Sequence, residues 1–310
     1  MIETELISII IPTFNRGHLV EDTLESFKKQ THQNWEIFVI DDHSTDNTKA
    51  IIEEIKDDRI KYYLRSKEYK KGPAGSRNYG ISLSNAEFVL IFDDDDIAHP
   101  QLLEFSLHYL KSEPNVDFCR YKRGIFYKKN KPNAVKLKLS ETKKSYFKYS
   151  QIPLVLDNTI PFNTCAILWK KECFENQKFN EELFYSDEWE FYYKVLKNNC
   201  SKGILIDQTL FWARKHEVSS TNNFHKGNKL YLNSTKKALK LVLNDLPCDF
   251  KTAALFKFYL RESIRLKDEK LLHILLKEFN LHPIKRLKYK LGFKLYPVLQ
   301  PIFKLKSKLK

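Results

Sequence analysis

The amino-acid sequence predicts an α/β fold built on a mainly parallel sheet. Short apolar segments rich in β-branched residues alternate with segments of helical periodicity over the first hundred residues. Near-continuous apolar strands are typical of parallel sheets that are covered by helices on both faces. Four consecutive aspartates, Asp93 to Asp96, directly follow one of these strands, at the sheet edge where open α/β sheets bind ligands. The 310 residues suffice for one large domain with an appendage or for two modest domains.

The expected strands of the first hundred residues each end at a turn-forming segment. The first, residues 6–11, ends at Pro12, and the next segment places Val20, Leu24 and Phe27 on one face of a helix. The elements expected after it are a strand at 35–40, a helix around 51–55 capped by Ser44 or Thr45, a strand at 60–64, a helix that begins at Gly72-Pro73, a strand at 88–92 and a helix through Leu103, Leu107 and Leu110.

Beyond residue 115 the pattern becomes less regular. The expected elements are strands at 117–127, 166–169 and 203–207, a mobile Lys-rich loop at 128–148, and a helix through Trp189 and Leu196. From about Lys229 the sequence is helical and basic to its end. A polar break near 222–228 predicts a boundary there. The expected division is a sheet-containing domain, 1–225, with halves 1–115 and 116–225, followed by a helical basic region, 226–310.

Composition limits the cellular environment that the sequence predicts. No apolar stretch reaches the roughly 20 residues that a membrane-spanning helix needs. The acidic N-terminus lacks the basic segment and the cleavage site of a signal peptide. The five cysteines are odd in number and widely spaced, without a Cys-x-x-Cys pair, which argues against a disulfide framework and against a structural zinc site. A reducing cytoplasm is therefore the expected compartment.

The run Asp93-Asp94-Asp95-Asp96 predicts a metal site. Four carboxylates within about 14 Å of extended chain repel one another unless a positive charge lies among them. Mg²⁺ or Mn²⁺, shared with a diphosphate, is the favoured neutraliser because both cations prefer oxygen ligands. Asp95 is the expected metal ligand, with Asp93 or Asp94 reaching a ribose or a water. The alternative interpretation is a solvated acidic turn.

A second acidic pair, Asp41-Asp42, ends the strand expected at 35–40. Parallel strands bring their carboxyl ends to one edge of the sheet, so this pair should face the Asp93–Asp96 run across a crevice. Asp42 is then placed to accept hydrogen bonds from a nucleobase or a ribose. Because carboxylates bind a diphosphate only through a cation, the pattern predicts metal dependence.

The segment Gly72-Pro73-Ala74-Gly75 is a tight turn into a helix that carries Arg77 in its second turn. It is either a structural turn or a ligand loop. In a ligand loop, the backbone N–H groups and the Arg77 guanidinium would contact a phosphate or an acidic group. The segment matches neither the P-loop pattern nor Gly-x-Gly-x-x-Gly.

Four motifs in register resemble glycosyltransferase family 2. They are Ser8–Arg16, Val39–Thr48, Gly72–Gly80 and Phe92–Asp96, in the family's order over about 100 residues. The resemblance implies a GT-A fold, a nucleotide-diphospho-sugar donor, a DxD metal site and inversion at the anomeric carbon. The residues then expected to bind the donor are Pro12, Thr13, Asn15, Arg16, Asp41, Asp42, Arg77, Asp93 and Asp94. Asp93 and Asp95 match the DxD pair, and Asp95 is the expected direct ligand of Mn²⁺ or Mg²⁺.

The resemblance continues, more weakly, to about residue 221. Asp187-Glu188 lies where the family has Glu-Asp before an amphipathic helix. The second position of that pair is the family's catalytic base, which implies Glu188. The inverted order leaves Asp187 as the alternative, and the plain alternative is a pair of acidic residues at a helix N-terminus. Arg214-Lys215-His216 resembles the family's Arg-x-His segment, so His216 is either a ligand of the metal or the diphosphate, or a structural histidine.

These features predict a metal-dependent, inverting glycosyltransferase of the hexosyltransferase type. It would move a sugar from a UDP- or GDP-linked donor to a hydroxyl of a glycan or lipid-linked acceptor. Many family members act in bacterial surface polysaccharide synthesis, which is the role this resemblance implies. One alternative is a metal-dependent nucleotidyltransferase or phosphatase, which would release pyrophosphate or phosphate. The other is a basic nucleic-acid-binding protein, which would need aromatic residues interleaved with Lys and Arg on a strand platform.

The net charge of +14 is concentrated toward the C-terminus, because residues 281–310 contain nine Lys or Arg and no Asp or Glu. Leucine, isoleucine, phenylalanine and tyrosine alternate with these basic residues, and Pro297 and Pro301 are expected to divide the segment into short helices. This composition favours the anionic inner face of a membrane as partner, rather than nucleic acid. The alternative is a helix packed on the sheet-containing domain. The expected localisation is cytoplasmic with peripheral membrane association.

Overall fold

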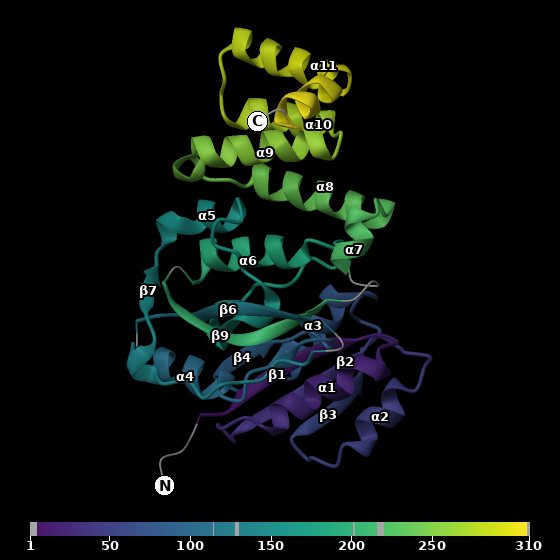
Figure 1. Ribbon diagram of the computed structural model, residues 1–310, viewed down its shortest axis with the longest axis vertical. Coiled ribbons are helices and arrows are strands. Elements are labelled where there is room, and N and C mark those ends of the chain that lie inside the picture. The colour runs from purple at the N-terminus through teal and green to yellow at the C-terminus, as the bar shows by residue number, and fades with distance from the viewer. Residues whose placement is uncertain (1–4, 114, 128–129, 201, 216–219, 309–310) are drawn as a thin grey trace.

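The computed structural model describes residues 5–308 except 114, 128–129, 201 and 216–219. The molecule is elongated, with a sheet-centred part that holds the N-terminal half and a stack of helices toward the C-terminus (Figure 1). The α/β fold predicted from the sequence is confirmed.

Among the described residues, a nine-stranded sheet has the order β3-β2-β1-β4-β8-β6-β9-β5, and β7 pairs with β9. The first four strands are parallel, as expected, and the second half of the sheet is mixed: β8 is antiparallel to both β4 and β6, while β6 and β9 are parallel. The strands are β1 (Ile7–Thr13), β2 (Trp35–Asp41), β3 (Ile60–Leu64), β4 (Phe88–Ile91), β5 (Ile97–Ala98), β6 (Phe118–Tyr127), β7 (Lys144–Phe147), β8 (Ile167–Lys170) and β9 (Gly203–Lys215).

Helices connect and cover the strands. Those of the sheet-centred part are α1 (Gly17–Lys28), α2 (Thr48–Glu54), α3 (Pro73–Leu83), α4 (Leu102–Ser112), α5 (Ile152–Leu156), α6 (Asp187–Asn198) and α7 (Ser220–His225). Helix α3 packs against β1 and β2. A glycine in its middle permits this approach, because a Cβ at Gly80 would lie 2.3 Å from Cγ2 of Ile10. The central strands are buried on both faces, which explains their continuous apolar sequence.

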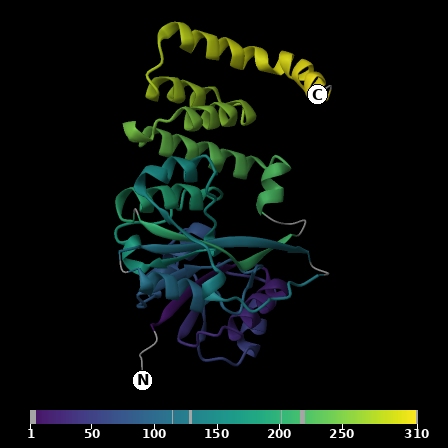
Figure 2. The same ribbon diagram turned by 60° about the vertical axis from the view of Figure 1, so that its left-hand side comes forward.

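Four further helices stack on α5 and α6 (Figures 1 and 2). They are α8 (Lys229–Asn244), α9 (Ala253–Arg265), α10 (Glu269–Glu278) and α11 (Pro283–Lys308). Side-chain oxygens of Asn228, Thr252 and Asp268 cap the first three by accepting backbone N–H groups. The buried apolar cluster runs without interruption from the sheet into α8, α9 and α10. The boundary expected at 222–228 stays a prediction.

Several local expectations were wrong. Neither Ser44 nor Thr45 caps α2; Asp46 Oδ1 accepts the N–H of Thr48 at 3.0 Å. The Lys-rich loop contains strand β7, an edge strand that begins with Lys144, and lysine is typical of exposed sheet edges. Strand β9 is 13 residues long because it pairs in turn with β7, β6 and β5.

The cysteine pattern and the C-terminal prolines were also misinterpreted. Cys173 and Cys200 form a disulfide, because the 3₁₀ turn after β8 and the end of α6 meet in space although 27 residues separate them. Helix α11 continues through Pro297 and Pro301 as one element, so the two prolines do not divide the segment into short helices. No helix among the described residues is both long and apolar enough to cross a membrane.

Candidate active site

The acidic loop, Asp93–Asp96, follows β4 at the carboxyl edge of the parallel strands. Its chain is fixed to β1 through the N–H of Phe92, which donates to the carbonyl of Ile10 at 2.9 Å. Asp94 and Asp96 are buried, whereas the side chain of Asp93 is 39% exposed. Burial raises the pKa of Asp94 to about 6 and that of Asp96 well above its usual range. Such a cluster needs cations nearby.

Arg16 supplies one of these cations from the turn between β1 and α1. Its Nη1 lies 2.9 Å from Asp94 Oδ1 and 2.7 Å from Asp95 Oδ2. The backbone N–H of Arg16 donates to Thr48 Oγ1 at 3.2 Å, which ties this turn to the start of α2. The structure thus brings Arg16 together with two of the aspartates of the acidic loop.

Arg77 supplies the second cation and joins the two halves of the site. Its buried guanidinium lies 2.7 Å from Asp187 Oδ2, 2.9 Å from Glu188 Oε1 and 3.4 Å from Asp93 Oδ1. Burial raises the pKa values of Asp187 and Asp93, and the Arg77 charge opposes that rise. One arginine thus joins Asp187 and Glu188 to the acidic loop, a contact that the sequence did not predict.

The two carboxylates on α6 differ in access. Ser186 has a positive φ of 63°, which turns the chain into the helix so that Asp187 and Glu188 occupy its first turn. The Asp187 side chain is 5% exposed and that of Glu188 is 30% exposed. Glu188 is the member of the pair that a molecule from solution reaches more readily.

Asp41 and Asp42 lie at the end of β2, next to the end of β1. Thr13 pairs with Asp41 and Pro12 with Ile40 in the parallel register. Asp41 accepts hydrogen bonds from the hydroxyl of Tyr62 at 2.7 Å and from the N–H of Ser44 at 2.8 Å. These bonds hold the strand end in place.

Asp42 is buried in an ion pair with Arg65 and accepts the N–H of Gly72 at 2.8 Å. Gly72 has a φ of 122°, a region that favours glycine. Asp42 therefore fixes the turn that leads into α3 and Arg77. Arg65 was not identified from the sequence, because its role depends on a pairing that only the parallel register of β2 and β3 creates.

The turn after β1 carries two further residues. Asn15, with a φ of 53°, donates its backbone N–H to Ser44 Oγ at 2.8 Å and accepts the N–H of Thr45 at 2.7 Å. Phe14 beside it is 41% exposed, and the Lys71 ammonium lies 4.8 Å from its ring centre. Sequence reasoning missed Phe14; an aromatic residue in a turn directly after a buried strand was the available signal.

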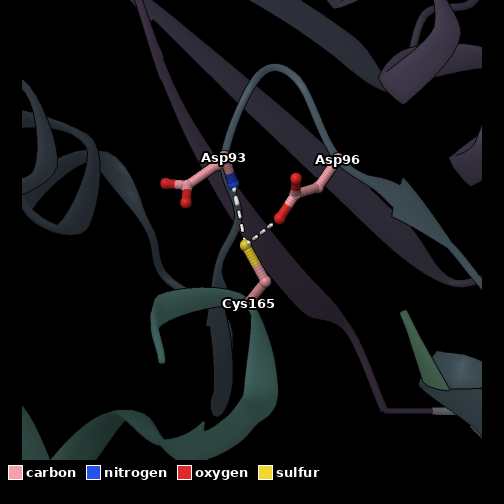
Figure 3. A group of neighbouring side chains, drawn as sticks. All are labelled: Asp93, Asp96 and Cys165. Atoms are coloured by element: carbon pink, nitrogen blue, oxygen red, sulfur yellow. Dashed lines mark hydrogen bonds between the residues drawn. The ribbon is translucent and has the colours of Figure 1, made fainter. Parts of the chain in front are cut away.

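Cys165, which precedes β8, is a further residue that the sequence did not indicate. Its sulfur accepts the N–H of Asp93 at 3.1 Å, and its thiol donates to Asp96 Oδ2 at 3.5 Å (Figure 3). Burial raises the pKa of this thiol well above its usual range, so it stays protonated and remains a donor. Cys165 links the first and last residues of the acidic loop.

Arg214, in β9, holds the acidic loop from another side. Its Nε donates to the carbonyl of Asp95 at 2.7 Å, its backbone N–H to Asp96 Oδ1 at 3.0 Å, and its Nη2 to Asp22 at 2.9 Å. His216, two residues further, lies outside the described residues, so its expected ligand role stays a prediction.

The donor atoms of this site fit a divalent cation. Ligand atoms of Asp93, Asp96 and Cys165 lie within 4.8 Å of one another, and Asp95 is adjacent on the same loop. Carboxylate oxygens are the ligands that Mg²⁺ and Mn²⁺ prefer. Cys165 donates to Asp96 and accepts the N–H of Asp93, and Asp96 also accepts the N–H of Arg214. Asp93 and Asp95 are therefore the better candidates for direct coordination.

Comparison with known sequences decides the family. The sequence profile described as Glycosyl transferase family 2 matches residues 8–176, more than half of the chain. The chain belongs to glycosyltransferase family 2. The match includes the acidic loop, Arg16, Arg77 and Cys165, and it ends before Asp187 and Glu188.

Curated relatives of this family-2 chain are bacterial glycosyltransferases. It is 34% identical over 191 residues to GalNAc(5)-diNAcBac-PP-undecaprenol β-1,3-glucosyltransferase of Campylobacter jejuni, covering 59% of this chain and 57% of the relative. It is 39% identical over 113 residues to a UDP-Glc:α-D-GlcNAc-diphosphoundecaprenol β-1,3-glucosyltransferase of Escherichia coli, covering 36% of this chain and 44% of the relative. The chain thus spans less than two thirds of these relatives.

Solved structures show the same fold. TarS residues 1–349 of Staphylococcus aureus, in complex with UDP-GlcNAc, align with a TM-score of 0.64 at 16% identity, covering 94% of this chain and 91% of TarS 1–349. A mannosyltransferase of Pyrobaculum calidifontis, in complex with GDP-Man and Mn²⁺, aligns with a TM-score of 0.58 at 15% identity, covering 97% and 83%. The GT-A fold implied by the sequence motifs is confirmed.

The contacts of Cys165 predict that its thiol positions the acidic loop for metal binding. Cys165→Ala removes both hydrogen bonds and should weaken Mn²⁺ binding about tenfold or more, the usual effect of losing a group that orients metal ligands. Cys165→Ser keeps a donor and an acceptor and should restore most of the affinity. Mn²⁺ titration calorimetry measures the effect.

The matched control is Cys119→Ala, which removes an equally buried cysteine in β6. It creates a similar cavity but leaves the acidic loop untouched. Equal losses of Mn²⁺ affinity in the two alanine variants would contradict the positioning role and assign the effect to packing.

Proposed function

We propose that this glycosyltransferase is metal-dependent and inverting, and that it transfers a hexose from a UDP- or GDP-sugar. The acceptor is a hydroxyl of a glycan or of a lipid-linked sugar in bacterial surface polysaccharide synthesis. The observation that carries the proposal is the Arg77 network, which joins Asp93 of the acidic loop to Asp187 and Glu188. A donor site and a candidate base thereby adjoin each other.

The donor end of the proposal rests on the acidic loop. Asp95 and Asp93 would hold Mn²⁺ or Mg²⁺, which when bound offsets the charge that develops on the departing diphosphate. Arg16 places its guanidinium against Asp94 and Asp95 and so keeps the carboxylates together before the donor enters. Relatives with undecaprenol-linked acceptors in their names support the acceptor class.

The nucleotide half of the donor would lie over the ends of β1 and β2. Thr13, Asn15 and Asp41 line up there with Pro12, and the exposed ring of Phe14 offers a stacking surface for a base. Because Asp42 is already paired with Arg65 and Gly72, we assign it the role of shaping the Gly72 turn. Because α3 begins at this turn, the turn sets the position of Arg77 in the helix.

Glu188 is the proposed base. Its carboxylate is more accessible than that of Asp187. In the described part of the chain, Arg77 pairs with one of the two carboxylate oxygens, Oε1. The carboxylate removes the proton from the acceptor hydroxyl while the oxygen forms its bond to the anomeric carbon and the diphosphate leaves on the opposite face. Asp187, held by Arg77 in a buried ion pair, orients that arginine.

A donor panel tests the class of reaction and its metal dependence together. Purified protein is incubated with UDP- and GDP-sugars and a lipid-linked acceptor, and released nucleoside diphosphate is measured with and without EDTA. Asp95→Ala should lower turnover by about two orders of magnitude or more, because the diphosphate loses its counter-charge. Release of pyrophosphate instead of nucleoside diphosphate would favour a nucleotidyltransferase, and full activity in EDTA would refute metal dependence.

Two isosteric variants, one at Glu188 and one at Asp187, test which carboxylate is the base. Glu188→Gln keeps size and hydrogen bonding but cannot take a proton, so turnover should fall roughly 10²–10⁴-fold with donor affinity little changed. Asp187→Asn should lose less turnover, since it weakens an ion pair rather than removing the base. The opposite ranking in the nucleoside-diphosphate assay would exchange the two roles.

The C-terminal helix supports a peripheral location at the inner face of a membrane. The side chains of Ile284, Leu287, Leu291 and Leu295 are all at least half exposed, and their spacing places them along one side of α11. Lys285, Arg286, Lys288, Lys290 and Lys294 flank them. Each basic residue near an anionic bilayer contributes about 1 kcal/mol, while the apolar side chains enter the interface.

Co-sedimentation with vesicles of anionic and of zwitterionic lipid tests this location. The full chain should bind anionic vesicles in a salt-sensitive manner, and Leu287→Glu with Leu291→Glu should abolish the binding. Leu64→Glu, at an equally exposed leucine on β3, is the control and should bind normally. Binding that is identical in all three proteins would leave α11 without a membrane role.

A further inference from the structure

A cavity on the sheet, lined by none of the residues of the acidic cluster, has the chemistry of a sugar-binding site. It has a volume of about 430 Å³ and lies between β9, β6 and the segment around residues 133–137. This volume falls in the range of small-molecule sites. Trp212 of β9 lines it and is partly exposed.

The indole of Trp212 packs closely against a glycine. Gly124 is its partner in the parallel register of β6 and β9, and a Cβ at Gly124 would come within 2.2 Å of the indole. His99 packs on the indole with ring centres 5.5 Å apart. The aromatic ring is thus held in one orientation with part of its surface open to the cavity, as apolar sugar faces require.

His99 is a fixed and neutral support. Its Nδ1 accepts the N–H of Gln101 at 3.0 Å, and its Nε2 donates to the carbonyl of Val135 at 3.1 Å. Burial lowers the pKa of this histidine. The bond to Val135 also holds the segment that closes one side of the cavity.

A β-bulge places polar groups around the indole. The β6–β9 register shifts between Leu205 and Thr209, so that Asp207 and Gln208 lie in the extra length of β9, where bulges redirect side chains. Asp207 Oδ1 accepts the N–H of Lys143 at 2.9 Å, and Gln208 Nε2 donates to Thr142 at 3.0 Å. These bonds fix both side chains while one oxygen of each has no hydrogen-bond partner among the described residues.

Two hydrogen-bond donors join these two acceptor oxygens in the lining of the cavity. Neither Trp212 Nε1 nor the exposed amide of Asn133 has a hydrogen-bond partner in the part of the chain that the structure describes. An apolar ring surface surrounded by a carboxylate, two amides and an indole N–H matches the alternation of C–H faces and hydroxyls in a pyranose. Among the described residues that line the cavity, Asp207 is the only acidic one and none is Lys or Arg, a composition that disfavours a phosphate or a lipid headgroup.

We propose that this cavity binds one uncharged sugar residue of a glycan chain, at a site separate from the proposed centre of sugar transfer. Trp212 stacks on the sugar ring, and Asp207, Gln208 and Asn133 bond its hydroxyls. Trp212 is two residues from Arg214, which contacts the carbonyl of Asp95, so a bound glycan lies on the strand that supports the acidic loop. The binding does not depend on the metal or on the proposed base.

The test uses the labelled full-length protein on an array of immobilised oligosaccharides containing glucose, galactose, N-acetylglucosamine and N-acetylgalactosamine. The oligosaccharide retained most strongly is then titrated in solution by calorimetry. Trp212→Leu should weaken binding about tenfold or more, because the stacking surface is lost. Asn133→Ala should weaken it several-fold, and because this exposed side chain makes no described hydrogen bond, the fold is unaffected.

Tyr127→Ala is the matched control, since it removes an exposed aromatic residue of β6, the strand paired with β9, outside the cavity. This variant should bind as the unaltered protein does. Retention of no oligosaccharide, or equal affinity in Trp212→Leu, Asn133→Ala and the unaltered chain, would overturn the proposal. Loss of binding in Asp95→Ala but not in Trp212→Leu would also overturn it and assign the glycan to the acidic cleft. Neither result bears on whether the protein transfers a sugar.

Discussion

The buried guanidinium of Arg77 is the contact on which the arrangement of the site depends. It forms ion pairs with Asp93 from the acidic loop and with Asp187 and Glu188 from α6, and so offsets part of their negative charge. Without that charge, carboxylates in a poorly hydrated site would repel one another, and breaking such a buried pairing costs about 3–5 kcal/mol. The position of Arg77 is set in turn by Asp42, which fixes the Gly72 turn.

The rest of the fold serves to bring these charges to one edge. Parallel pairing of β1, β2 and β4 aligns the turns that carry Arg16, Asp42 and the acidic loop. The turn that leads into antiparallel β8 brings Cys165 against that loop, and β9 brings Arg214 against it. The acidic loop is therefore held by bonds from β1, from the turn before β8 and from β9. The protein's own contacts thus hold its carboxylates in place.

Strand β9 connects this site with the rest of the molecule. Its length lets it pair with three other strands, and its bulge places Asp207 and Gln208 in the lining of the cavity beside Trp212. Near its end Arg214 faces the acidic loop, while Trp212 and the bulged residues line a cavity of nearly uncharged character. Toward the C-terminus, α8 packs on α6, and its Ser234 accepts the N–H groups of Phe184 and Tyr185, so the helical stack steadies the segment that leads to Glu188.

The sequence by itself determined the parallel half of the sheet, the family, and the acidic clusters Asp93–Asp96 and Asp187-Glu188. Strand periodicity, turn residues and charge runs are local signals, so they can be recognised without the tertiary structure. Tertiary structure alone decided the partners: Arg65 for Asp42, Arg77 for Glu188, Cys165 for the acidic loop, and Cys173 for Cys200. Each of these pairs is distant in sequence and meets only through strand order and register, which local periodicity does not encode. For the same reason the bulge in β9 and the cavity beside Trp212 were invisible before the strands were paired.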